Sequence, residues 1–403
     1  MVRTPYSCAP YGDGWKGDLT EYMTEFLKNK YIIVFQDVRG RYMSEGEYEN
    51  VRPFDPHKSE LDTDEASDTF DTIEWLLENT DNNGSVGVTG MCYPGFYATM
   101  AALSGHPALK AVSPQAPILD WFKGDDVHHN GALMLLDIYS FAPYMFKKHD
   151  NPVKEDHGLE SPVGDNAYSW FLGKQTLSNM TASLPDTLSF WNEILEHPHY
   201  DEYWKERSIE PHLNDVQPAI LVVGGEYDTD DCYGALNTYK LIRDNSPDTD
   251  LHFVYGPWTH GGWHNADYEG LGDRKFGENL SQYFMEKIEY PFFRYYLEGK
   301  GQRPEPVYLF ASGSQQWQFM DKWPADDTEY TPLYLSEDRS LSYESPSQLQ
   351  SSDTYCSDPF TPVPFMADAT RRDNSYMAAD QSFASTRKDV LTFTSEVIDE
   401  IIK

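Results

Sequence analysis

Residues 85–103 read SVGVTGMCYPGFYATMAAL, and this stretch decides the fold. The apolar run at its start predicts a buried strand, and the run after Gly95 predicts a helix. Between them, GMCYPG (90–95) resembles the strand–turn–helix motif G-x-S-x-G, the nucleophile elbow. Cys92 stands where the motif has serine, and one additional residue precedes the last glycine. The sequence therefore predicts that Cys92 lies at the carboxyl end of a strand.

The chain on both sides of the elbow alternates strands and helices. YIIVFQD (31–37) and LKAVSPQAP (109–117) are apolar runs typical of buried strands, while residues 18–29 and 62–79 have helical spacing. Alternation of this kind predicts a parallel sheet with helices on both of its faces.

The same alternation returns later in the chain. Strands are predicted at 218–228 and 250–258, and helices between them and at 273–298. The intervening residues are rich in Trp, His, Asp and Pro without strand periodicity, which predicts a mostly helical insertion. From about residue 303, short strands alternate with Pro/Ser/Asp loops, as in a separate β domain. The predicted domains are an α/β core in two parts (1–117 and 216–302), a helical cap (118–215) and a β domain (303–403).

The composition excludes several functions. A formal charge of −35 over 403 residues argues against nucleic acid or an anionic membrane as partner. No apolar run is long enough to span a membrane. The four cysteines lack the spacing of a zinc ribbon or a disulfide scaffold, and the glycines between His260 and His264 argue against a helical metal site. No phosphate-binding or dinucleotide motif occurs, so we expect no cofactor.

Three polar residues follow three predicted strands in a particular order. Cys92, Asp228 and His260 come directly after them, and the order nucleophile, acid, histidine is that of α/β-hydrolases. The carboxyl ends of parallel strands meet at one edge of a sheet, so these side chains are expected to converge. Each alone has a simpler explanation, because a buried cysteine is often only a small apolar residue.

Several blocks in order make a family resemblance specific. The sequence resembles the family of cocaine esterase, α-amino-acid ester hydrolases, glutaryl-cephalosporin acylases and X-Pro dipeptidyl-peptidases. The matching blocks are RTPY (3–6), QDVRGRYMSEGEY (36–48), GMCYPG (90–95), GPWTHGG (256–262) and DPFTPVP (358–364). The resemblance implies an α/β-hydrolase core, a helical cap and a C-terminal jelly-roll, which is truncated in this chain.

The resemblance also implies roles for individual residues. It assigns the oxyanion hole to the Tyr6 hydroxyl and the Tyr93 backbone N–H. Its α-amino-acid ester hydrolase branch has a carboxylate cluster for the substrate's ammonium group, and the residues at matching positions are Asp126, Asp230 and Asp231. Asp125 is a competing candidate for the first of these carboxylates. The alternatives are ordinary packing for Tyr6 and solvated loop charges for the aspartates.

Cys92 is the main departure from the family's serine. A thiol beside a histidine is a good nucleophile, but sulfur is larger than oxygen and alters the fit to an oxyanion hole. We expect a hydrolase or acyltransferase acting on small esters or amides of α-amino acids through a covalent acyl-enzyme. The alternatives are a general carboxylesterase or acylase, and a silenced relative that only binds amino-acid-like ligands.

Both ends of the sequence differ from the family pattern. The first residues match a block that follows the family's early strands, and the end falls within the expected jelly-roll. Unpaired sheet edges would result, so we expect a partner such as a second copy, a longer native chain or reduced stability. The last residues, 397–403, are expected to pack as a helix or strand. No signal peptide is recognised in this chain, and the resemblance is compatible with a periplasmic or secreted protein.

Overall fold

A computed structural model describes most of the chain, and the following statements concern that part. The described residues are 1–12, 23–59, 62–145, 149, 151–156, 161–184, 188–348 and 350–397. The last predicted helix or strand, at 397–403, therefore lies almost wholly outside the described residues. Residues 18–22, the first part of the helix predicted at 18–29, also lie outside the described residues. Its second part contains the helix α1 (Thr24–Lys28).

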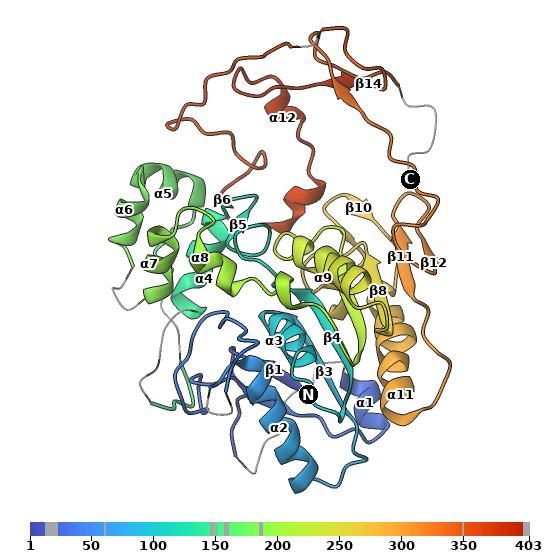
Figure 1. The fold of residues 1–403 in the computed structure, drawn as a ribbon. Coiled ribbons are helices and arrows are strands. Elements are labelled where there is room, and N and C mark those ends of the chain that lie inside the picture. The colour runs from blue at the N-terminus through green and yellow to red at the C-terminus, as the bar shows by residue number, and fades with distance from the viewer. Residues whose placement is uncertain are drawn as a thin grey trace.

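The centre of the fold is a six-stranded sheet in the order β12-β11-β8-β7-β4-β3 (Figure 1). All neighbouring strands in it are parallel except the antiparallel pair β11–β12. The strands are β3 (Val86–Cys92), β4 (Leu109–Pro117), β7 (Ala219–Gly225), β8 (Leu251–Gly256), β11 (Val307–Ala311) and β12 (Gln316–Met320). The parallel arrangement predicted from the strand–helix alternation is confirmed.

A second pair of strands continues this sheet beyond β3. β1 (Val2–Thr4) pairs in parallel with β2 (Phe35–Asp37). Met1 N–H donates to the Gly87 carbonyl at 2.8 Å, and the Thr89 N–H donates to the Met1 carbonyl at 3.0 Å. The strand predicted at 31–37 is shorter than expected because its pairing with β1 begins at Phe35.

Helices cover both faces of the sheet, as its apolar strands require. One face carries α2 (Glu65–Asn79), α3 (Tyr93–Ala102) and α9 (Cys232–Asn245); the other carries α1, α10 (Leu280–Tyr283), the π-helix η4 (Phe284–Glu289) and α11 (Tyr290–Glu298) (Figure 1). Successive strand side chains point to opposite faces. Val222 accordingly belongs to the first apolar core and Val223 to the second.

The insertion between β4 and β7 is mostly helical, as predicted, with one short hairpin in addition. The hairpin is β5 (His128–His129) and β6 (Ala132–Leu133). The helices are α4 (Leu135–Met145), α5 (Ala167–Lys174), α6 (Leu177–Thr181), α7 (Ser189–Glu196), α8 (Glu202–Arg207) and the 3₁₀ turn η2 (Glu210–His212).

The prediction of one helix over 273–298 is wrong at its start, because the helical residues begin only at Leu280. The residues before it form the small hairpin β9 (Gly270–Leu271) and β10 (Arg274–Lys275). Gly277 has φ +121° and Asn279 has φ +61°, and left-handed backbone at these positions cannot continue a right-handed helix.

The C-terminal region also differs from expectation. β11 and β12, predicted to open a separate β domain, extend the central sheet instead: Val307 pairs with Phe253 of β8. Val307, Tyr308 and Phe310 are buried, so this strand belongs to the main core. The later elements are a three-stranded sheet of β13 (Tyr334–Leu335), β14 (Ser340–Ser342) and β15 (Thr394–Ser395), with the turn η5 (Asn374–Ala378) and α12 (Ser382–Ser385). The predicted domain boundaries themselves stay predictions.

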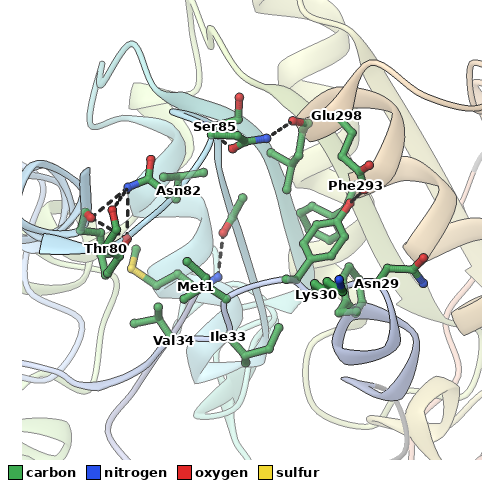
Figure 2. Close-up of a pocket in the computed structure, with 18 of the residues that line it drawn as sticks. Met1, Asn29, Lys30, Ile33, Val34, Thr80, Asn82, Ser85, Phe293 and Glu298 are labelled. Carbon is green, nitrogen blue, oxygen red and sulfur yellow. Dashed lines mark hydrogen bonds between the residues drawn. The ribbon is translucent and has the colours of Figure 1, made fainter. Parts of the chain in front are cut away.

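A cavity of about 530 Å³ lies at the amino ends of β1 and β3 (Figure 2). It is bordered by Met1, Ile33, Val34 and Phe293, and neither cysteine nor histidine is among its described lining residues. Cys92 lies at the opposite end of β3, so this cavity is separate from the predicted catalytic residues. None of the helices in the described part of the chain combines the length and apolar character needed to cross a bilayer.

Candidate active site

Cys92 occupies the turn between β3 and α3, where the sequence predicts it. Its backbone has φ +66° and ψ −128°, a strained conformation typical of a nucleophile elbow. A Cβ on Gly90 would lie 2.2 Å from the Pro94 carbonyl oxygen, and one on Gly95 would lie 2.6 Å from the Gln115 carbonyl oxygen. Both glycines are therefore required by close packing, and Pro94 lies in the first turn of α3, where proline is well tolerated.

Asp228 holds the imidazole ring of His260. The His260 Nδ1 lies 3.0 and 3.1 Å from the two Asp228 carboxylate oxygens. Asp228 is buried, and its Oδ1 also accepts from the backbone N–H groups of Asp230 at 2.8 Å and Asp231 at 3.1 Å. These bonds fix the carboxylate, which in turn fixes the ring with Nδ1 toward Asp228.

His260 and Cys92 meet at the carboxyl edge of the sheet. One ligand-type atom each from Cys92, His260 and Asp231 all lie within 4.8 Å of one another. Burial opposes a charge on His260, but the negative groups of Asp228 and Cys92 together raise its pKa well above the ordinary value. The three residues predicted from strand ends are thus brought together in one cluster.

Tyr6 also lies beside the Cys92 sulfur. Its hydroxyl oxygen is 3.6 Å from the Cys92 Sγ. Removal from water, followed by the neighbouring Cys92 charge, raises the Tyr6 pKa well above the ordinary value. The hydroxyl therefore keeps its proton and can donate a hydrogen bond to a group that lies beside Sγ.

The loop that carries Tyr6 is fixed by Asp37 at the end of β2. Asp37 Oδ1 accepts from the Cys8 N–H at 2.8 Å, and its Oδ2 accepts from the Tyr11 hydroxyl at 2.6 Å. The Arg41 Nε–H donates to the Pro5 carbonyl at 3.1 Å. These contacts hold the segment on both sides of Tyr6.

The Tyr93 side chain is bonded away from the cluster, so the role predicted for Tyr93 depends on its backbone N–H. Its ring is buried, and its hydroxyl oxygen accepts from the Val51 N–H at 2.7 Å and donates to Asn50 Oδ1 at 3.2 Å. Tyr93 is the first residue of α3, where backbone N–H groups have no acceptor within the helix. That N–H is the second donor that the sequence predicts for an oxyanion.

Asp125 and Asp126 have different surroundings, which separates the two competing candidates. The carboxylate of Asp125 accepts three backbone N–H groups, from Leu119 at 2.8 Å, Asp120 at 2.9 Å and Gly234 at 2.7 Å. It therefore holds the start of the cap against α9. Among the described residues, Asp126 accepts no such set of backbone N–H groups, and it stays the predicted member of the ammonium cluster.

Asp126 contacts the loop that follows β7. The Trp121 Nε1–H donates to its Oδ2 at 3.1 Å, and its backbone N–H donates to the Asp230 carbonyl at 3.1 Å. Burial, followed by the charge of Asp230, raises the Asp126 pKa to about 7. A cation placed near Asp126 would therefore favour the ionised form of its carboxyl group.

Asp231 has the least compensated carboxylate in the cluster. It is 0% exposed, and neither carboxylate oxygen has a hydrogen-bond partner among the described residues. Its Oδ2 lies 3.9 Å from His260 Nδ1. Burial first, and then the charge of Asp126, raise its pKa well above the ordinary value. A buried carboxyl without partners is destabilising by a few kcal/mol, unless a ligand supplies donors.

Arg372 is a charged neighbour that sequence reasoning missed. It comes from the C-terminal region and forms an ion pair with Asp230 at 2.6 Å and another with Asp137 of the cap. Burial opposes a charge on Asp230, but His260 and Arg372 hold its pKa below the ordinary value. Arg372 and Asp230 are 142 residues apart, and no local motif signals their contact.

Sequence profiles of two known domains match most of this chain. The sequence profile of the X-Pro dipeptidyl-peptidase (S15) family matches residues 1–262. The profile of the X-Pro dipeptidyl-peptidase C-terminal non-catalytic domain matches residues 291–401.

The chain belongs to the X-Pro dipeptidyl-peptidase (S15) family.

Relatives within and around the S15 family are hydrolases of esters and peptides. Cocaine esterase of Rhodococcus sp. (strain MB1 Bresler) is 28% identical over 429 residues, covering 100% of this chain and 70% of that protein. An α-amino acid ester hydrolase structure has a TM-score of 0.85 and 30% identity, covering 98% of this chain and 67% of the other. An aminopeptidase of a marine sediment Thaumarchaeota archaeon has a TM-score of 0.86 and 31% identity, covering 98% and 66%. The α/β-hydrolase fold and the hydrolase family are both confirmed.

This chain differs from the relatives described here in two respects. A candidate serine esterase of Mycobacterium bovis is 25% identical over 83% of this chain, but the present elbow carries cysteine. The chain also spans only 55% of that relative's length and about two thirds of the two solved structures. Its activity and substrate are therefore argued from its own site.

Proposed function

We propose that this S15 member cleaves esters or amides of small α-amino acids, or transfers their acyl groups, through an acyl-thioester on Cys92. The observation that carries this proposal is the buried, unpartnered carboxylate of Asp231 beside the Cys92–His260–Asp228 cluster. A cluster that holds a nucleophile and an unpartnered carboxyl within a few ångströms suits a substrate with a carbonyl carbon next to an ammonium group.

The acylation step uses the three clustered residues in separate roles. Cys92 gives its proton to His260 Nε2, and the resulting thiolate sulfur attacks the substrate carbonyl carbon. The negative charge that develops on the carbonyl oxygen is met by the Tyr6 hydroxyl and the Tyr93 N–H. His260 then donates the proton to the leaving alcohol or amine, the carbon–heteroatom bond breaks, and Asp228 keeps the ring oriented throughout.

Release of the acyl group repeats these steps with a new nucleophile. His260 Nε2 takes a proton from water or from an acceptor amine, which attacks the thioester carbonyl. The tetrahedral intermediate collapses, and the proton returns from His260 to the Cys92 sulfur. Thioesters react readily with amines, so the cysteine favours acyl transfer relative to a serine at the same position.

The substrate's ammonium group is bound by the carboxylate cluster. The Asp231 oxygens have no hydrogen-bond donor among the described residues. The Asp126 carboxyl accepts one hydrogen bond from a side chain, the Trp121 Nε1–H. Asp230 adds a third carboxylate whose charge is shared with Arg372. An ammonium carries three donors, and three acceptors around it would replace its lost hydration.

Asp231→Asn is expected to lower kcat/KM for an α-amino ester by about 10- to 100-fold, because it removes a charge-assisted hydrogen bond worth ~1.5–3 kcal/mol. The matched des-amino ester should change by less than about 3-fold, since it has no ammonium to bind. Steady-state kinetics with the two esters measures the difference. Equal losses with both esters would show that Asp231 acts on His260 and not on the substrate.

Arg372→Gln is expected to lower KM for the α-amino ester by about 2- to 5-fold. Arg372 competes with the ammonium for Asp230, and a partly exposed ion pair is worth only ~0.2–1 kcal/mol. Arg371→Gln, which alters the neighbouring exposed residue, serves as the control. An increase in KM for Arg372→Gln would mean that the arginine assists binding, contrary to this account.

Two assays on the wild-type chain test the proposed function against its alternatives. Ester turnover is measured with an α-amino ester and its des-amino analogue, and binding of an amino-acid amide is measured by calorimetry. Turnover that prefers the α-amino ester supports the proposal. Equal turnover of both esters would indicate a general carboxylesterase, and binding without any turnover would indicate a silenced, ligand-binding relative.

A further inference from the structure

Cys92, His260 and Asp231 form a cluster with the residue types of a metal site. One ligand-type atom from each lies within 4.8 Å of the others. They come from the end of β3, the loop after β8 and the residue that precedes α9. Because they are far apart in the chain, no spacing motif in the sequence could reveal this combination.

Asp231 gives this cluster ligand atoms that have no hydrogen-bond partner among the described residues. This holds for both Asp231 oxygens, whereas His260 interacts with the Cys92 thiol in addition to Asp228. Asp231 is completely buried, so bulk water does not compensate its carboxylate. The Asp230 carboxylate lies 3.9 Å from His260 Nδ1 and shares its charge with Arg372.

The chemistry of the three ligand atoms favours zinc. Zn²⁺ binds thiolate, imidazole and carboxylate, and its tetrahedral ligands lie roughly 3.3–3.8 Å apart, so shifts of about 1 Å or less would close the site. The Asp228 carboxylate on Nδ1 is the outer partner that zinc-binding histidines commonly have. A serine hydroxyl at position 92 would be a much poorer ligand than the cysteine thiolate.

We propose that Cys92, His260 and Asp231 bind one Zn²⁺ ion that reversibly blocks the active site. On binding, the protons held by the Cys92 sulfur, His260 Nε2 and the Asp231 carboxyl pass to solvent, the sulfur forms the Zn–S bond, and Nε2 and an Asp231 oxygen donate lone pairs; no electron is transferred. The sulfur and Nε2 are the two atoms that attack and proton transfer require. The inhibitory consequence rests on the function proposed above, whereas the binding itself does not.

Zinc binding is tested on the full-length chain without substrate. Calorimetric titration with ZnCl₂ is expected to show about one equivalent bound, and CoCl₂ is expected to give a sulfur-to-cobalt charge-transfer band. Cys92→Ser and Asp231→Asn should each weaken Zn²⁺ binding by at least about 10-fold. Cys356→Ser, which alters an exposed thiol, should leave both signals unchanged.

The outcomes separate this proposal from the proposed catalytic function. A cobalt–sulfur band lost in Cys92→Ser supports the metal site even if the wild-type chain turns over no ester. Absence of the band in the wild-type chain, or Zn²⁺ affinity that is unchanged in Cys92→Ser, overturns the proposal even if the enzyme is active. In an active chain, Zn²⁺ should raise the apparent KM and a chelator should restore it.

Discussion

Cys92→Ala is expected to lower kcat/KM for an α-amino ester by at least about 10⁴-fold. The substitution removes the only group that can form the covalent intermediate in this account, and loss of a nucleophile has effects of this size in comparable sites. KM should change little, because the Tyr6 hydroxyl and the carboxylate cluster remain. Stopped-flow or steady-state ester hydrolysis measures the loss.

The control for this variant is Cys356→Ala, which changes an exposed thiol and should retain full activity. Cys92→Ser distinguishes an active thiol from a silenced site. If the wild-type chain is inactive and Cys92→Ser gains activity, the cysteine has silenced the site. If Cys92→Ala keeps most of the wild-type activity, the nucleophile lies elsewhere.

Tyr6→Phe is expected to lower kcat by about 10²- to 10³-fold with little change in KM. The hydroxyl that lies 3.6 Å from Sγ is placed to meet the oxyanion, a charge that exists only in the transition state and the intermediate. Pre-steady-state measurement of acylation reports this step directly.

Tyr11→Phe is the matched control, because it removes a hydroxyl from the same loop that bonds Asp37 and not Cys92. If loosening of the loop explained the loss, both variants would fall to a similar extent. A Tyr6→Phe variant with unchanged kcat would assign the oxyanion contact to other donors.

Much of the core could be predicted because its signals are local. The glycines and the strand–helix change around Cys92 predict the elbow. The strands that precede Asp228 and His260 place both residues at the same sheet edge. Parallel strands bring their carboxyl ends together, so residue order along the chain was sufficient to predict the cluster.

The parts that could not be predicted depend on long-range contacts. Arg372 reaches Asp230 from the C-terminal region, and nothing near either residue encodes that pairing. β11 joins β8 because its apolar residues extend the core, although the surrounding composition resembles a separate β domain. Asp125 and Asp126 are adjacent and chemically identical in the sequence, and the three backbone donors around Asp125 distinguish their surroundings.

Intact-protein mass spectrometry after rapid mixing with an α-amino ester tests the central claim most directly. The account predicts a mass increase equal to the acyl group, mapped by proteolysis to Cys92 and absent from Cys92→Ala. An acyl group found on another residue, or no adduct on a chain that turns the ester over under conditions that trap thioesters, would contradict it.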